Sequence, residues 1–258
     1  MATIPQTRRE QLGEERFFFI MACVMSAIIV AGFSMNLAMG RSTFAVPLIY
    51  HVHALVFFSW VALYLAQNFL VASDRLAVHR RLGWASVILA PVMVVLGVTI
   101  MVVSMRRTGG PFFFDQNEFM ISNPLSLVCF VTFVFAAVKL RRNTGWHRRL
   151  MFMAMAILTG PGLGRLLPMP LLMPHAWRIM VVVTMIIPVI MMIADKRRNG
   201  QIHPAWLWGI GAVLLTQVVA DVIAYSDFGL SLTQSVIEGT PGAERPMSAF
   251  LPPEFAAP

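Results

Sequence analysis

Seven long apolar runs dominate the sequence and restrict the fold that it can adopt. A helix that crosses a membrane needs about 20 predominantly apolar residues, and the runs are close to this length. Of the 258 residues, 58% are hydrophobic and only 12% are charged, whereas soluble domains carry about 25% charged residues. The sequence therefore predicts an all-α, polytopic integral membrane bundle with seven transmembrane helices. The predicted spans are 17–39, 46–72, 83–105, 124–140, 147–167, 176–194 and 204–225.

Three regions are predicted around these spans. Residues 1–16 form an N-terminal segment, residues 17–225 form the transmembrane domain, and residues 226–258 form a tail. The tail contains several Pro, Gly and Ser residues, so we expect a flexible extension. Prolines also interrupt two of the spans, including Pro161 in the fifth and Pro188 in the sixth.

The distribution of basic residues predicts the orientation in the membrane. Most of the 20 Lys and Arg residues lie in the N-terminal segment and in the second, fourth and sixth loops. Cytoplasmic loops carry an excess of Lys and Arg, so the N-terminus is predicted to be cytoplasmic and the C-terminus extracytoplasmic. Contact with anionic lipid headgroups explains the net charge of +8. Membrane lipids are therefore expected partners, and nucleic acid is not.

All six histidines lie at or near the start of a predicted span. The partial positive charge of a helix N-terminus favours neutral imidazole, which is the form that binds metal ions or haem iron. Two of the histidines begin copies of the sequence His-Arg-Arg-Leu, whose arginines are expected to contact lipid phosphates. The predicted cytoplasmic layer contains His79, His147 and His203, and the outer layer contains His51, His53 and His175.

The second predicted span has one polar and aromatic face. His53, Trp60, Tyr64 and Gln67 recur there at helical spacing, so this face is expected to point into the protein. Ionisable residues inside a membrane are candidates for function, which favours a ligand cavity along this face. The alternative for His53 is a buried side chain that is hydrogen-bonded to a neighbouring helix.

Polar side chains of later spans are predicted to complete this cavity. Arg165 follows a Gly-Pro-Gly stretch, and irregular backbone at membrane depth persists only where it is buried or lines a cavity. Gln217 and Asp221 share a face of the last span, and an aspartate there is costly unless it is paired. We expect these residues, with Arg178, to bind an anionic or carbonyl group. A salt bridge from Asp221 to Arg165 or Arg178 is the alternative.

Two resemblances to known families extend this interpretation. The run His53…Gln67…His79-Arg80-Arg81-Leu82-Gly83, followed by His147-Arg148-Arg149-Leu150-Met151 and Arg165, resembles a family of uncharacterised bacterial multi-span membrane proteins with paired His-Arg-x-Leu-Gly and His-Arg-Arg-x-Met motifs. This resemblance covers about residues 50–210 and implies the bacterial inner membrane as the location. The histidine layers are similar to those of two-haem membrane cytochromes of the b561 type. That similarity implies haem b between His53 and His175 and between His79 and His147, and no other metal site is expected.

Three hypotheses for the function follow. The first is electron transfer through b-type haem, linked to quinone. The second is binding or transport of a small lipophilic or anionic ligand in the cavity. The third is an accessory role in a homo-oligomer or in a larger membrane complex.

Overall fold

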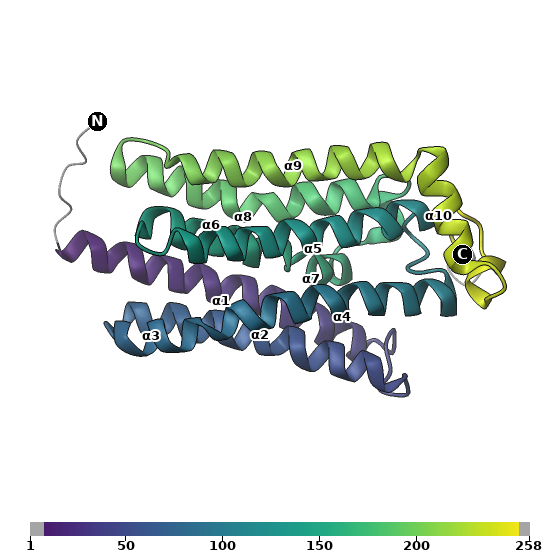
Figure 1. The fold of residues 1–258 in the computed structure, drawn as a ribbon, viewed down its shortest axis with the longest axis horizontal. Helices are drawn as coiled ribbons and strands as arrows, with labels where there is room; N and C mark the ends of the chain where they lie inside the picture. The colour runs from purple at the N-terminus through teal and green to yellow at the C-terminus, as the bar shows by residue number, and fades with distance from the viewer. Residues whose placement is uncertain (1–7, 253–258) are drawn as a thin grey trace.

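The computed structural model describes residues 8–252, and this part of the chain forms an elongated bundle of helices without strands (Figure 1). The predicted N-terminal segment and the predicted tail include residues 1–7 and 253–258, which lie outside the described residues. The α-helices are α1 Arg8–Ala38, α2 Leu48–Ala72, α3 Leu76–Gly83, α4 Ala85–Thr108, α5 Gln116–Lys139, α6 Thr144–Ile157, α7 Gly160–Leu166, α8 Ala176–Asn199, α9 Pro204–Ala224 and α10 Asp227–Ile237. Two short 3-10 helices, η1 Met169–Leu172 and η2 Pro241–Glu244, complete the described elements.

Six helical segments within residues 8–252 are long and apolar enough to cross a membrane. They are α1, α2, the joined helices α3 and α4, α5, α8 and α9. The predicted all-α bundle with membrane-length helices is thereby confirmed. The bundle has two ends, which we call the α3 end and the α10 end after the helices that lie there (Figure 1).

The fifth predicted span, 147–167, is not one continuous helix. Helix α6 ends at Ile157, and α7 begins at Gly160 with Pro161 in its first turn. Proline has no N–H to donate and its ring clashes with the preceding turn, so a helix usually breaks at this position. The fourth predicted span, in contrast, is longer than expected, because α5 already begins at Gln116.

The centre of the bundle is formed around α5. This helix packs against α4, α6 and α9, while α1 packs against α2 and α7. Fully buried apolar side chains fill the space between these helices, including Phe130, Phe152 and Trp206. The contact between α1 and α7 is especially close, because Gly32 and Gly162 face each other there. Small residues allow such close approach of helix backbones in membranes.

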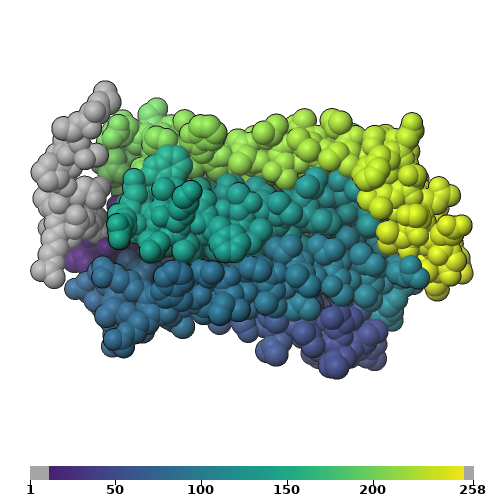
Figure 2. All heavy atoms as spheres, viewed as in Figure 1, coloured from purple at the N-terminus to yellow at the C-terminus, as the bar shows by residue number. Residues whose placement is uncertain are grey.

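The prediction of a flexible tail is wrong for the part that the structure describes. Helix α10 and η2 fold back on the α10 end of the bundle, where Figure 2 shows the tail in yellow covering the neighbouring helices. Arg245 accounts for much of this order. Its guanidinium donates hydrogen bonds to the carbonyls of Gly109, Gly110, Pro111 and Phe114 at 2.8–3.1 Å. Burial lowers the pKa of Arg245 to about 10, so the side chain stays charged at neutral pH.

Candidate functional site

A large cavity lies inside the bundle. Its volume is about 890 Å³, and its walls are mostly apolar and aromatic. Helices α1, α2, α4, α5, α7, α8 and α9 contribute to it, together with the loop between α4 and α5. Three of the predicted site residues line this cavity, namely His53, Arg165 and Gln217. We call it the main cavity.

Arg165 is the most distinctive polar group of the main cavity. It lies on α7, where its Nη1 donates a hydrogen bond of 2.8 Å to the carbonyl of Pro161, and its guanidinium carbon lies 4.0 Å from the centre of the Phe33 ring. Among the described residues, no carboxylate forms an ion pair with Arg165. The short helix therefore holds a cation at the cavity wall without a counter-ion from the described part of the chain.

His53 lies in the α2 wall of the same cavity. Its ring packs against Phe57 with centroids 4.1 Å apart. The Nδ1 atom is buried and has no hydrogen-bond partner within the described part of the chain. An unpaired buried polar atom is costly, so a ligand that pairs with Nδ1 would be favoured.

A chain of hydrogen bonds leads away from the cavity wall to a partly exposed ion pair. Trp177 Nε1 donates to Gln217 Oε1 at 2.8 Å, and Gln217 Nε2 donates to Asp221 Oδ1 at 2.8 Å. Arg178 Nε donates to Asp221 Oδ2 at 2.8 Å and lies near the buried Glu118, with 3.5 Å between Nη2 and Oε1. Arg178 and Asp221 thus form the salt bridge that the sequence left as an alternative. They lie behind Gln217 and are not part of the cavity lining.

The other residues of the predicted polar face do not reach the main cavity. Trp60 and Tyr64 are buried in the core, where Trp60 packs edge-on against Phe130. Gln67 lies at the α3 end, because 14 residues separate it from His53 and a helix rises about 1.5 Å per residue. The residues share one face of α2 but differ in depth.

The structure brings the predicted cytoplasmic pair of histidines together. The rings of His79 and His147 lie with centroids 6.2 Å apart and nearly perpendicular planes. His147 Nδ1 is 2.9 Å from the carbonyl of Ala137, which fixes a proton on Nδ1 and leaves Nε2 free. Gln67, oriented with its amide nitrogen towards His79 Nδ1, accepts a hydrogen bond of 2.9 Å from the backbone of Gly83.

Only one histidine of the predicted outer pair lines the main cavity. His53 lines the main cavity, whereas His175 is exposed just before α8 and does not line it. The outer haem between these two residues stays a prediction. Within residues 8–252, no group of three His, Cys, Asp or Glu side chains is placed to hold a metal ion.

A buried charge cluster at the α3 end was missed by the sequence analysis. We call it the Arg149 cluster, and its members are Glu14, Arg148, Arg149, Asp195 and Trp206. Arg149 is 2% exposed and lies 2.6 Å from Asp195 and 3.3 Å from Glu14, and Arg148 also pairs with Glu14. Trp206 Nε1 donates to Asp195 at 2.6 Å. The expectation that these arginines contact lipid phosphates is wrong for Arg149, because its charge is already neutralised inside the protein.

His203 lies beside this cluster and begins α9. Its Nδ1 accepts a hydrogen bond of 3.2 Å from the backbone N–H of Ala205, as a capping side chain does. Burial and the nearby charge of Arg149 together lower the pKa of His203 to about 4. Burial therefore favours neutral imidazole at this helix start, and the neutral ring caps α9.

Comparisons with known proteins do not identify a family for this chain. No model of a protein family matches the chain, and no curated protein or solved structure matches it either.

Proposed function

We propose that the chain crosses the bacterial inner membrane seven times, with its N-terminus in the cytoplasm. Helices α6 and α7 together would form the fifth crossing, in addition to the six membrane-length segments. The bias of basic residues supports this orientation, since the loops at the α3 end are rich in arginine. Figure 1 agrees with an odd number of crossings, because α1 begins at the α3 end and α10 lies at the other.

We further propose that the main cavity binds a small lipophilic molecule with an anionic head. The observation that carries this proposal is Arg165, a cation in the wall of a mostly apolar cavity that has no acidic partner among the described residues. The volume of about 890 Å³ is within the range of ligand pockets. Arg165 would pair with the head, His53 would form a hydrogen bond with it, and the aromatic walls would hold the apolar body.

The preference for an anion follows from the chemistry of the guanidinium. It is always charged and presents several N–H donors in a plane, which matches the two oxygens of a carboxylate. The contacts to Pro161 and Phe33 hold the group in place before a ligand arrives, which reduces the entropic cost of binding. A quinone has carbonyl acceptors but no negative charge, so we expect it to compete weakly for the same cavity.

Replacing Arg165 by glutamine is expected to weaken binding of an anionic probe strongly. A hydrogen bond to a charged group contributes about 1.5–3 kcal/mol, which corresponds to a loss of roughly 10–100-fold in affinity. The measurement is a fluorescence titration of the detergent-solubilised protein with cis-parinaric acid, corrected for empty micelles. Its uncharged methyl ester should lose little affinity from the same substitution.

A suitable control is Arg106→Gln, since Arg106 is exposed at the same end of the bundle and does not line the cavity. Equal losses in the two variants, or a wild-type protein that binds neither probe, would contradict the proposed function.

A second candidate function is electron transfer through b-type haem, and the pairing of His79 with His147 favours it. A haem iron held there would carry single electrons. His147 suits this role, because its Nδ1 is bonded to a backbone carbonyl and its Nε2 is free. His79 would first have to move its proton from Nε2, since Gln67 donates to its Nδ1.

The absorption spectrum of the isolated protein tests this candidate. Bound haem gives a Soret band and a pyridine haemochrome, and His147→Ala should remove both. His175→Ala is the matched control, because His175 is exposed and takes no part in the pair. A wild-type preparation without a Soret band, obtained from cells supplied with haem precursor, would eliminate the candidate.

A further inference from the structure

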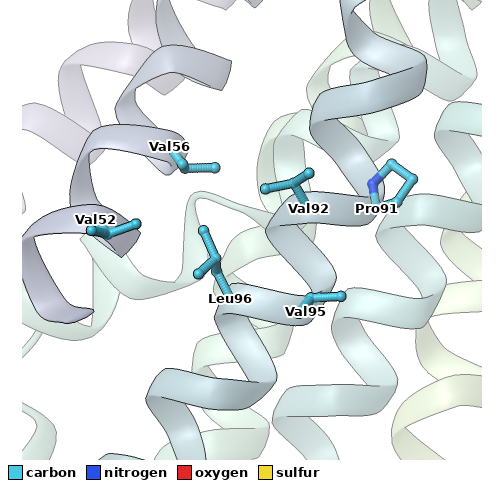
Figure 3. A pocket seen from close by; sticks show the side chains of 6 residues that line it. All are labelled: Val52, Val56, Pro91, Val92, Val95 and Leu96. Atoms are coloured by element: carbon cyan, nitrogen blue, oxygen red, sulfur yellow. The ribbon is translucent and has the colours of Figure 1, made fainter.

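A second hollow lies on the outside of the bundle, between α2 and α4 (Figure 3). Its volume is about 490 Å³, and all of its lining side chains are apolar. Val52 and Val56 of α2 face Val92 and Leu96 of α4 across the gap in Figure 3. We call it the Val92 groove, and its lining residues are Val52, Val56, Pro91, Val92, Val95 and Leu96. Val95 is 65% exposed, so in a membrane the groove opens towards the lipid chains.

The Val92 groove and the main cavity lie on two sides of the contact between α2 and α4, which we call the seam. On α2, Val52 and Val56 line the groove while the next residues in the chain, His53 and Phe57, line the cavity. Successive residues of a helix point about 100° apart, so the two hollows are separated by the thickness of one helix–helix contact.

On α4, too, neighbouring residues line the groove and the cavity. Leu96 lines the groove, and the next residue, Gly97, lines the cavity without a side chain. Groove and cavity residues therefore alternate along both helices at this contact. The half-buried side chains of Val56 and Leu96 are therefore the main barrier between the lipid side and the cavity.

Helix α4 contains a proline beside these side chains. Pro91 lies inside α4 and lines the groove. A proline in a helix interior removes one backbone hydrogen bond and clashes with the preceding turn, and sharp bends of helices concentrate at such residues. A small movement of α4 at Pro91 would separate Val92 and Leu96 from α2.

From this geometry we propose that the seam between α2 and α4 is a lateral entrance through which the ligand passes between the membrane and the main cavity, with the Val92 groove holding its hydrocarbon tail. This inference rests on the proposed binding function. A lipophilic molecule resides in the bilayer before it binds, and the groove offers it only apolar contacts. The groove adjoins the cavity along α2 and α4, and this adjacency identifies the occupant as the tail of the cavity ligand.

A reversible cross-link across the seam tests the entrance. Cysteines are introduced as Val56→Cys and Val92→Cys in a protein whose native Cys23 and Cys129 are replaced by alanine. Oxidation should join α2 to α4, and reduction should release them. In stopped-flow measurements with cis-parinaric acid, we expect oxidation to slow association and dissociation by at least about tenfold, because binding would then lack a conformational change that it requires. The dissociation constant should change much less, and reduction should restore both rates.

Leu96→Trp provides an independent obstruction of the seam, and Leu215→Trp is its control on an exposed position of α9. Slower rates in Leu96→Trp alone support the entrance even if the cross-link forms poorly. Unchanged rates in both the cross-linked protein and Leu96→Trp would overturn it and leave entry from the α10 end. If the reduced protein does not bind the probe at all, the proposed function fails instead of the entrance.

Discussion

Replacing Arg149 by methionine is expected to destabilise the folded protein by about 3–5 kcal/mol, because the substitution leaves Glu14 and Asp195 as buried acids that have lost a partner. The residues of the Arg149 cluster come from α1, α6, α8 and α9, so its disruption loosens four helices at once. The change in the free energy of unfolding is measured by unfolding the protein in mixed micelles with an increasing fraction of dodecyl sulfate.

The first His-Arg-Arg-Leu sequence provides a matched control for this prediction. Arg81 occupies the same place in that motif as Arg149 does in the second, but it is exposed. Arg81→Met should change the free energy of unfolding by less than about 0.5 kcal/mol. Combining Arg149→Met with Asp195→Asn should recover part of the loss, since one uncompensated charge is removed. Equal stability of Arg149→Met and Arg81→Met would show that the cluster does not hold the helices together.

Replacing Gly162 by alanine is expected to cost about 1–3 kcal/mol, as overpacking of a tight contact does. The new Cβ would lie 2.8 Å from the Cα of Ile29 and 2.9 Å from the carbonyl oxygen of Ile28. These are backbone atoms of α1, which cannot turn aside as a flexible side chain can. Helix α7 must therefore shift, and Arg165 shifts with it. We expect lower thermal stability together with weaker binding of cis-parinaric acid.

Gly211→Ala is the control for this second prediction. Gly211 lies in α9, and a Cβ added there would meet nothing within 4 Å. Alanine is favoured over glycine in a helix interior by roughly 0.5–1 kcal/mol, so this variant should be as stable as the wild type or slightly more stable. A Gly162→Ala protein that behaves like Gly211→Ala would show that α1 and α7 are not in tight contact.

Helical periodicity predicted the direction of site residues better than their depth. His53 and Gln67 lie on one face of α2 as expected, yet only His53 lines the main cavity, while Gln67 contacts His79 at the other end of the bundle. Periodicity specifies an angle around the helix, and it contains no information about which neighbouring helices leave a space at a given height. The pairing of Asp221 with Arg178 rather than Arg165 was undecided for the same reason.

The two His-Arg-Arg-Leu motifs show a second limit of sequence reasoning. Identical residues have different environments, since Arg81 is exposed and Arg149 is buried against two carboxylates. The difference arises from Glu14 and Asp195, which are 135 and 46 residues away from Arg149 in the chain. Two acidic residues at the otherwise basic ends of predicted spans were the available signal. Their partners depend on how the helices are arranged around each other.

The contacts of Arg245 also determine the order in which the protein can be completed during synthesis. Arg245 follows every membrane-length helix in the chain, but the carbonyls that it binds belong to the loop between α4 and α5. While the ribosome is still extending the later helices, these carbonyls lack the hydrogen bonds from Arg245, and the loop that lines the main cavity lacks this support. The cavity is thus completed only after the last membrane-length helix has left the ribosome.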